Sequence, residues 1–418
     1  MTTWRAWTRG GDRFLTGAMG ASLLASGLTL VLLGTFRVHG DGDVYFAFLQ
    51  RLVGEKQDAG VAYQYGSALW NVPFYLVGHV VGRGEIAVGV ASATAAVLTV
   101  YLAWRLLRIL DLPRGPIVLL AAFYGTPLWF YVYYEPSYTH AADALFFTLS
   151  AVLLFETVCN RSHRDGRAAL LGLSLAGLVA IRYANAAAVP GFLIVLVLAR
   201  RLRLLSIATG FLVIAAAAIL LIPISRGIPL GTVGAPPAPG SLGNPVQGGK
   251  TSFDLLAPVK MLLTVRRGLF LWTPLALVGV VGYAFLLVGT RSVAARLSLA
   301  GLGVGGLGVV MIYALWGSWW TGGFSFSARF LSGLFPVFVL GVAEVVRRLP
   351  RLGPVLALAG ALFSIHVGLN VHYGYAGQSE ADGLDRIVRL YTEGERTVPG
   401  LLRGVAADAR DRVQRFVP

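Results

Sequence analysis

The sequence contains few charged residues and a single cysteine. Only 13% of its 418 residues are charged, whereas a soluble domain carries about 25%. One cysteine excludes an intrachain disulfide, and with it a disulfide-bridged extracellular module. The sequence also lacks HExxH, P-loop and GxSxG motifs, and its six histidines are scattered, so no common catalytic or metal-binding signature stands out.

The sequence consists largely of long apolar runs. Hydrophobic residues make up 56% of the chain, and the mean hydropathy is +0.70. The stretch 14–36 has no charged residue and is long enough to cross a hydrocarbon core of about 30 Å. We expect an all-α polytopic membrane protein. The stretch is too long for the core of a signal peptide, so we interpret it as a retained first helix.

The apolar pattern predicts about eleven transmembrane helices, within a range of about 10 to 13. The segment 67–82 is apolar but short, and we interpret it as an interfacial or re-entrant helix. The predicted spans are 14–36, 85–107, 115–134, 138–159, 168–184, 186–200, 204–225, 269–289, 297–316, 328–346 and 353–373.

Arginine clusters in short loops set the predicted orientation, because cytoplasmic loops are enriched in basic residues. We place the N-terminus in the cytoplasm and the C-terminus outside, in a cytoplasmic (inner) membrane. The net charge of +15 then indicates contact with anionic membrane lipid, and we expect no nucleic-acid partner.

The predicted organisation is one transmembrane domain, 1–373, followed by a short extracytoplasmic amphipathic tail, 374–418. The domain includes a first outer loop, 37–84, and a Pro/Gly-rich outer loop, 226–268. We detect no internal repeat of the kind found in many transporters.

Two carboxylates, Asp41 and Asp43, follow the first predicted span. The apolar and aromatic residues after them recur at helical spacing, which would place an acid at a helix N-terminus, where backbone N–H groups favour its ionised form. Such a carboxylate can act as a general base toward a hydroxyl. The alternative is a solvated start of a loop.

More ionisable residues fall at the predicted outer ends of later spans. Asp143 lies one turn into a span, where a carboxylate needs a polar cavity or a partner. Arg182 lies near the outer end of another span, where its neighbours Tyr183 and Asn185 suggest a polar pocket, and a snorkelling arginine is the alternative. Glu135 and His140 lie in a predicted hairpin, where they could also be ordinary turn residues.

The remaining outer segments contain paired arginines and clustered aromatic residues. Arg266 and Arg267 suit a phosphate or pyrophosphate, although lipid headgroups in general would suit them too. Aromatic rings beside small polar residues are typical of a sugar-binding face, and an interfacial aromatic belt is the alternative. The candidate substrate-binding residues in these segments are the aromatic Tyr63, Tyr65, Trp319 and Trp320, together with Arg329.

Four stretches together resemble one family. They are GDGDVYFAFLQRLV (40–53), YQYGSALWNVPFYLVG (63–78), VRRGLFLWTPLALVG (265–279) and WWTGGFSFSARFLSGLFP (319–336). Their order and their common side of the membrane resemble the GT-C superfamily of integral-membrane glycosyltransferases. The likeness is to bacterial members related to protein mannosyltransferases and lipid A aminoarabinose transferase. Many relatives have Asp-Glu where this chain has Asp41-Gly42, so the choice between Asp41 and Asp43 stays open.

The resemblance implies a GT-C-like fold and a sugar transfer on the outer face. The donor would be a polyprenyl-phosphate sugar, with its phosphate held by Arg266, Arg267 and Arg182, and the acceptor a glycan, lipid or protein. Asp41 or Asp43 would deprotonate the acceptor hydroxyl, and the anomeric configuration would invert. Some relatives bind a divalent cation and others do not, and this sequence offers no clear metal ligands.

Two other classes of function remain as alternatives. A transporter or flippase of a lipid-linked sugar would carry polar groups at mid-membrane. A non-catalytic scaffold of the cell envelope would not need the Asp41/Asp43 pair.

Overall fold

The structure is a computed structural model, and it describes residues 38, 41–55, 66–113, 115–160, 162–225, 256–264, 268–314, 326–374 and 407. The first predicted span (14–36), most of the predicted outer loop (226–268) and nearly all of the predicted tail (374–418) lie outside these residues.

The described residues fold into helices, and no strand occurs among them, which confirms the predicted all-α class. The elements are α3 (Asp41–Leu52), α4 (Gly66–Val80), α5 (Gly84–Ile109), α6 (Pro116–Tyr124), α7 (Leu128–Tyr133), α8 (His140–Cys159), α9 (Arg164–Ile181), η1 (Tyr183–Ala188), α10 (Val189–Leu198), α11 (Leu202–Ser225), α12 (Ala257–Leu263), α13 (Leu269–Trp272), α14 (Pro274–Gly289), α15 (Val293–Ala314), η3 (Arg329–Leu334), α16 (Phe335–Arg348) and α17 (Leu352–Gly374).

Within the described residues, six helices are long and apolar enough to cross a membrane. They are Gly84–Ile109, His140–Cys159, Leu202–Ile222, Val293–Ala314, Arg329–Arg348 and Leu352–Leu369. Large apolar side chains on α11 and α17 point outward, as expected of helices that face lipid. The protein is therefore a multi-pass membrane protein, and the total of about eleven spans stays a prediction.

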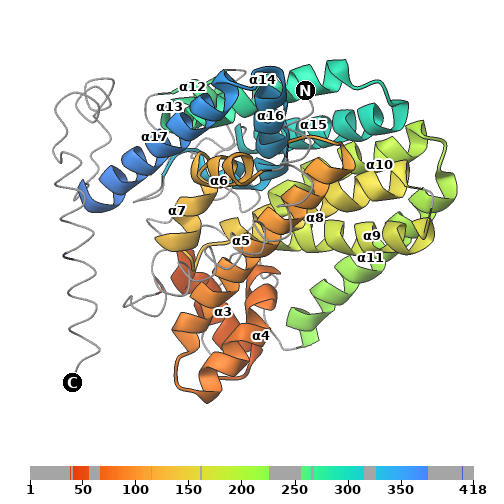
Figure 1. Ribbon diagram of the computed structural model, residues 1–418. Helices are drawn as coiled ribbons and strands as arrows, with labels where there is room; N and C mark the ends of the chain where they lie inside the picture. Colours follow the sequence, from red (N-terminus) through yellow and green to blue (C-terminus); the bar gives the residue numbers. More distant parts are fainter. Residues whose placement is uncertain are drawn as a thin grey trace.

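Two predicted segments have an instructive local structure. The predicted span 115–134 is divided into α6 and α7, because Gly125 ends α6 and Pro127 caps α7. The segment 67–82 forms α4, whose 15 residues are too few to cross the hydrocarbon core. Figure 1 shows α4 beside α3, and the two helices share a small apolar core formed by Leu49, Leu52 and Tyr75.

Polar contacts between helix termini define two ends of the bundle. At one, Arg182, directly after α9, contacts Thr139 before α8 and Tyr313 near the end of α15. At the other, Glu156 near the end of α8 pairs with Arg105 of α5 and Arg167 of α9. We call these the Arg182 end and the Glu156 end. Antiparallel helices α8 and α9 connect them.

Glycines allow α14 and α16, which lie together at the top of Figure 1, to pack at close range. A Cβ at Gly341 of α16 would collide with the carbonyl oxygen of Gly279 on α14, and a Cβ at Gly282 would collide with the carbonyl oxygen of Gly341. Small residues at such crossings are how membrane helices gain dispersion contacts without a hydrophobic driving force.

We therefore expect Gly341→Ala to destabilise the protein. The added methyl group forces α14 and α16 apart, at a cost of about 1–3 kcal/mol. Thermal unfolding in detergent, followed by tryptophan fluorescence, measures the effect. The matched control is Gly210→Ala on α11, where an added Cβ meets no atom within 4 Å. Equal unfolding temperatures for both variants and the wild type would contradict the close-packing argument.

Candidate active site

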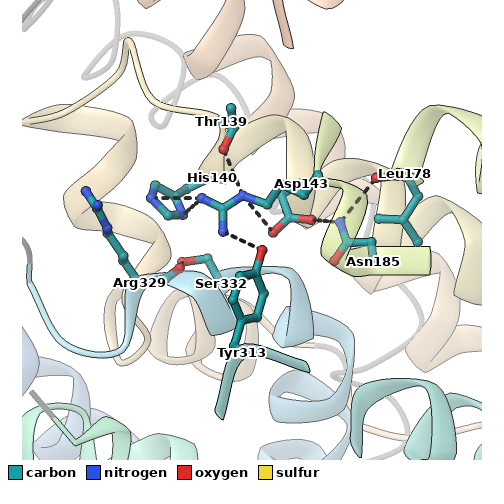
Figure 2. Close-up of polar contacts among 9 residues, drawn as sticks. Thr139, His140, Asp143, Leu178, Asn185, Tyr313, Arg329 and Ser332 are labelled. Carbon is teal, nitrogen blue, oxygen red and sulfur yellow. Dashed lines mark hydrogen bonds and ion pairs between the residues drawn. The ribbon is translucent and has the colours of Figure 1, made fainter. Parts of the chain in front are cut away.

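Arg182 is the centre of a buried polar cluster at the Arg182 end. It follows α9 in an extended conformation, and its side chain is buried. Its Nε donates to the Thr139 hydroxyl at 2.8 Å, its Nη1 donates to the Tyr313 hydroxyl at 3.3 Å, and its Nη2 lies 3.1 Å from His140 Nδ1 (Figure 2). One guanidinium thus joins the termini of α8, α9 and α15.

Asp143 supplies the negative charge in this cluster. It lies in the first turn of α8, and its Oδ2 is 3.7 Å from Arg182 Nε. Its Oδ1 accepts a hydrogen bond of 2.7 Å from Asn185 Nδ2, and Asn185 also donates to the Leu178 carbonyl (Figure 2). Gly333 packs so tightly against the carboxylate that a Cβ there would lie 2.9 Å from Oδ2. The Asp143 carboxylate is therefore held in place from three sides.

Arg182 and a second buried guanidinium, that of Arg329, contact the same aromatic ring. The Cζ atoms of Arg182 and Arg329 lie 5.2 and 4.9 Å from the centre of the Phe330 ring. Tyr313 stacks on the same ring, with 4.9 Å between centroids. Tyr138 lies over Arg329 at 5.3 Å. Aromatic faces stabilise both cations where water is excluded.

The backbone before Arg329 is fixed by a single side chain. The Tyr131 hydroxyl accepts from the Phe326 N–H and donates to the Phe326 carbonyl. The Ser332 hydroxyl donates to the Arg329 carbonyl, which closes the first turn of η3. Figure 2 shows the Arg329 side chain beside His140.

Helix α3 brings the segment that follows the first predicted span to the same cluster. The predicted helix is present and begins at Asp41. Gly42 packs against the Ser137 hydroxyl, with which any Cβ at this position would collide. Tyr45, one turn along, lies near enough to Arg182 for an electrostatic interaction between them. The N-terminus of α3 therefore adjoins the segment that leads into His140 and Asp143.

The structure brings together several of the residues selected from the sequence. Arg182, His140, Asp143 and Arg329 form the cluster, and Glu135 is buried in the hairpin before it. Asp43 is exposed at the start of α3, and the Asp41 side chain lies outside the described parts. Six further candidates also lie outside the described residues: Tyr63, Tyr65, Arg266, Arg267, Trp319 and Trp320.

The sequence analysis did not select Thr139 or Tyr313, both of which contact Arg182. It noted Asn185 only as a polar neighbour of Arg182, and the structure shows Asn185 bonded to Asp143. The sequence carried no signal for Tyr313, because it is one of 16 tyrosines and lies 131 residues from Arg182.

Within the part of the chain that the structure describes, no group of three or more His, Cys, Asp and Glu residues is arranged to hold a metal ion.

Solved structures similar to this chain include GT-C glycosyltransferases. The oligosaccharyltransferase of Archaeoglobus fulgidus in its apo form has a TM-score of 0.50 and 12% identity, over 94% of this chain and 59% of that one. A second structure is the oligosaccharyltransferase AglB of that organism with an inhibitory peptide and a dolichol-phosphate. Its TM-score is 0.49 and its identity is 14%, over 91% of this chain and 58% of that one. ArnT from Cupriavidus metallidurans bound to undecaprenyl phosphate has a TM-score of 0.48 and 12% identity, over 97% of this chain and 75% of that one.

These likenesses concern the fold. The TM-score of 0.50 confirms the predicted GT-C-like fold, and this chain spans about three fifths of the length of the oligosaccharyltransferase. No family model and no curated protein matches the chain.

We expect Asp143→Asn to destabilise the protein by about 3–5 kcal/mol, because it leaves the buried Arg182 charge without its carboxylate. The measurement is thermal or denaturant unfolding in detergent. Asp165→Asn is the matched control: it removes the same charge from the exposed Asp165–Arg203 pair, where the loss is below about 1 kcal/mol. Equally small effects would show that Asp143 does not compensate Arg182.

Proposed function

We propose that this protein is a membrane glycosyltransferase. It transfers a sugar from a polyprenyl-phosphate-linked donor to a hydroxyl of a glycan, lipid or protein acceptor. One observation carries the proposal: the start of α3, with its two aspartates, lies against the segment that holds the buried Arg182–His140–Asp143 cluster. The GT-C-like fold supports the same reaction class.

Asp41 is the proposed general base, with Asp43 as the alternative. Asp41 is the first residue of α3, where the unpaired N–H groups and the helix dipole favour an ionised carboxylate. The base removes the acceptor proton as the hydroxyl attacks the anomeric carbon in line with the departing phosphate, so the configuration inverts. Phosphate is a good leaving group, and the reaction requires no strong general acid.

The buried guanidiniums provide the positive field for the donor phosphate. Arg182 and Arg329 are both buried, and Arg182 is paired with the carboxylate of Asp143. Arg266 and Arg267 complete the phosphate site in this proposal. Asp143 then acts by holding Arg182 in place.

The sugar and acceptor are bound by the residues around this cluster. Glu135, His140 and Arg329 are its described members, and His140 is in contact with the Tyr131 ring at 4.1 Å between centroids. Tyr63, Tyr65, Trp319 and Trp320 are the proposed stacking and hydrogen-bonding partners of the sugar.

The position of the cluster favours a transferase over a carrier. Asp143 and His140 lie in the first turn of α8, and Arg182 directly follows α9, so the charges gather at helix ends. A carrier would place them near the middle of the membrane. The arginines of the loops at the Glu156 end indicate that this end is cytoplasmic and that the Arg182 end, with the active site, lies outside the inner membrane.

The test is sugar transfer by purified protein in lipid, with a panel of radiolabelled polyprenyl-phosphate sugars and a crude envelope fraction as acceptor. The wild type should move label to the acceptor. Asp41→Asn should lower the rate by about two to four orders of magnitude, the usual contribution of a general base, while expression and unfolding temperature stay unchanged.

Asp43→Asn is the matched control and should retain transfer. Loss of activity in Asp43→Asn alone would make Asp43 the base, and full activity in both variants would refute a carboxylate base in this loop. Labelled lipid that becomes accessible across the bilayer without donor consumption would favour the carrier.

A further inference from the structure

A polar pocket of about 1040 Å³ lies at the Glu156 end, outside the candidate active site. The last turns of α5 and α8 and the start of α9 form its walls. Tyr101, Trp104 and Arg108 line it from α5, Phe155 and Glu156 from α8, and Arg167 from α9.

One buried carboxylate organises the basic side chains of this pocket. Glu156 Oε1 is 2.6 Å from Arg105 Nη2, and Oε2 is 3.3 Å from Arg167 Nε. Arg108 lies over the Trp104 ring at 5.5 Å and is not part of these ion pairs. Three guanidiniums therefore face one carboxylate, and the pocket has an excess of positive charge.

The pocket and the candidate active site are at opposite ends of the same helix. Asp143 is in the first turn of α8 and Glu156 in its last two turns, a separation of about 20 Å at 1.5 Å per residue. Helix α8 is also long and apolar enough to span the membrane. Whichever way the protein is oriented, the pocket therefore belongs to the leaflet opposite to the active site.

The aromatic residues place the pocket at headgroup depth. Tyr101 is exposed and stacks against Trp104, as aromatic residues do at a membrane interface. An apolar and aromatic wall beside guanidiniums suits a phosphate that is attached to a glycerol and acyl chains. Basic pockets between transmembrane helices are known to take anionic headgroups.

We propose that this pocket binds the phosphate group of an anionic phospholipid from the leaflet opposite to the active site. The lipid phosphate contacts Arg108 and the outward faces of Arg105 and Arg167, while Tyr101 and Trp104 pack against the glycerol region. This inference is independent of the proposed sugar transfer.

The natural sequence supplies a probe, because its one cysteine, Cys159, lines the pocket and is exposed. Labelling of Cys159 by a neutral maleimide is measured in vesicles of phosphatidylcholine with increasing phosphatidylglycerol. Occupation of the pocket should protect the thiol. A labelling rate that does not depend on phosphatidylglycerol would overturn the proposal.

Arg108→Gln tests the contact without breaking the Glu156 ion pairs. It should raise the phosphatidylglycerol content needed for half protection about fivefold. Arg203→Gln, an exposed arginine at the same end that pairs with Asp165, is the control and should behave as the wild type. Equal effects of the two variants would show that surface charge in general, and not the pocket, is responsible.

A separate arm identifies the source of the phosphate. Inorganic phosphate is added to phosphatidylcholine vesicles in place of phosphatidylglycerol, and it should give no protection. Protection by inorganic phosphate alone would overturn the lipid assignment in favour of a site for a free anion. Native mass spectrometry should show more retained phosphatidylglycerol on the wild type than on Arg108→Gln.

Discussion

The buried charge of Arg182 is the constraint on which the Arg182 end of the structure depends. A guanidinium away from water is costly unless charge and hydrogen bonds compensate it. Here Asp143, Thr139, His140 and Tyr313 provide this compensation, and they come from the termini of α8 and α15. The contacts that compensate the Arg182 charge therefore fix how three helix ends meet. They also fix the place where α3 can pack.

The same principle applies elsewhere in the bundle. Glu156 pairs with arginines of two neighbouring helices, and the fully buried Glu344 pairs with Arg347 and Arg348 at the end of α16. Asp143, Glu156 and Glu344 all lie within about two turns of a helix end. Charges there can be reached by partners from adjoining loops. The middle of each described span contains no Asp, Glu, Lys or Arg, which limits the cost of holding charge in a membrane.

Much of the candidate site could be predicted from the sequence because charges are rare in it. A carboxylate such as Asp143 inside an apolar stretch indicates a partner, and Arg182 at the end of another stretch is a natural one. The full set of contacts could not be predicted, since Tyr313 is an ordinary residue at a helix end whose role depends on tertiary packing. The division of 115–134 into α6 and α7 was missed because hydropathy alone does not register Gly125 and Pro127.

The buried guanidiniums of the cluster are consistent with the direction of the proposed reaction. A polyprenyl-phosphate sugar is a phosphodiester with one negative charge, and its product is a phosphate monoester with nearly two near pH 7. Negative charge therefore grows on the phosphate as the sugar leaves. Two buried guanidiniums, Arg182 and Arg329, provide fixed positive charge where water is excluded. Such a preorganised field stabilises the departing phosphate more than the bound donor, which is the condition for catalysis by electrostatics.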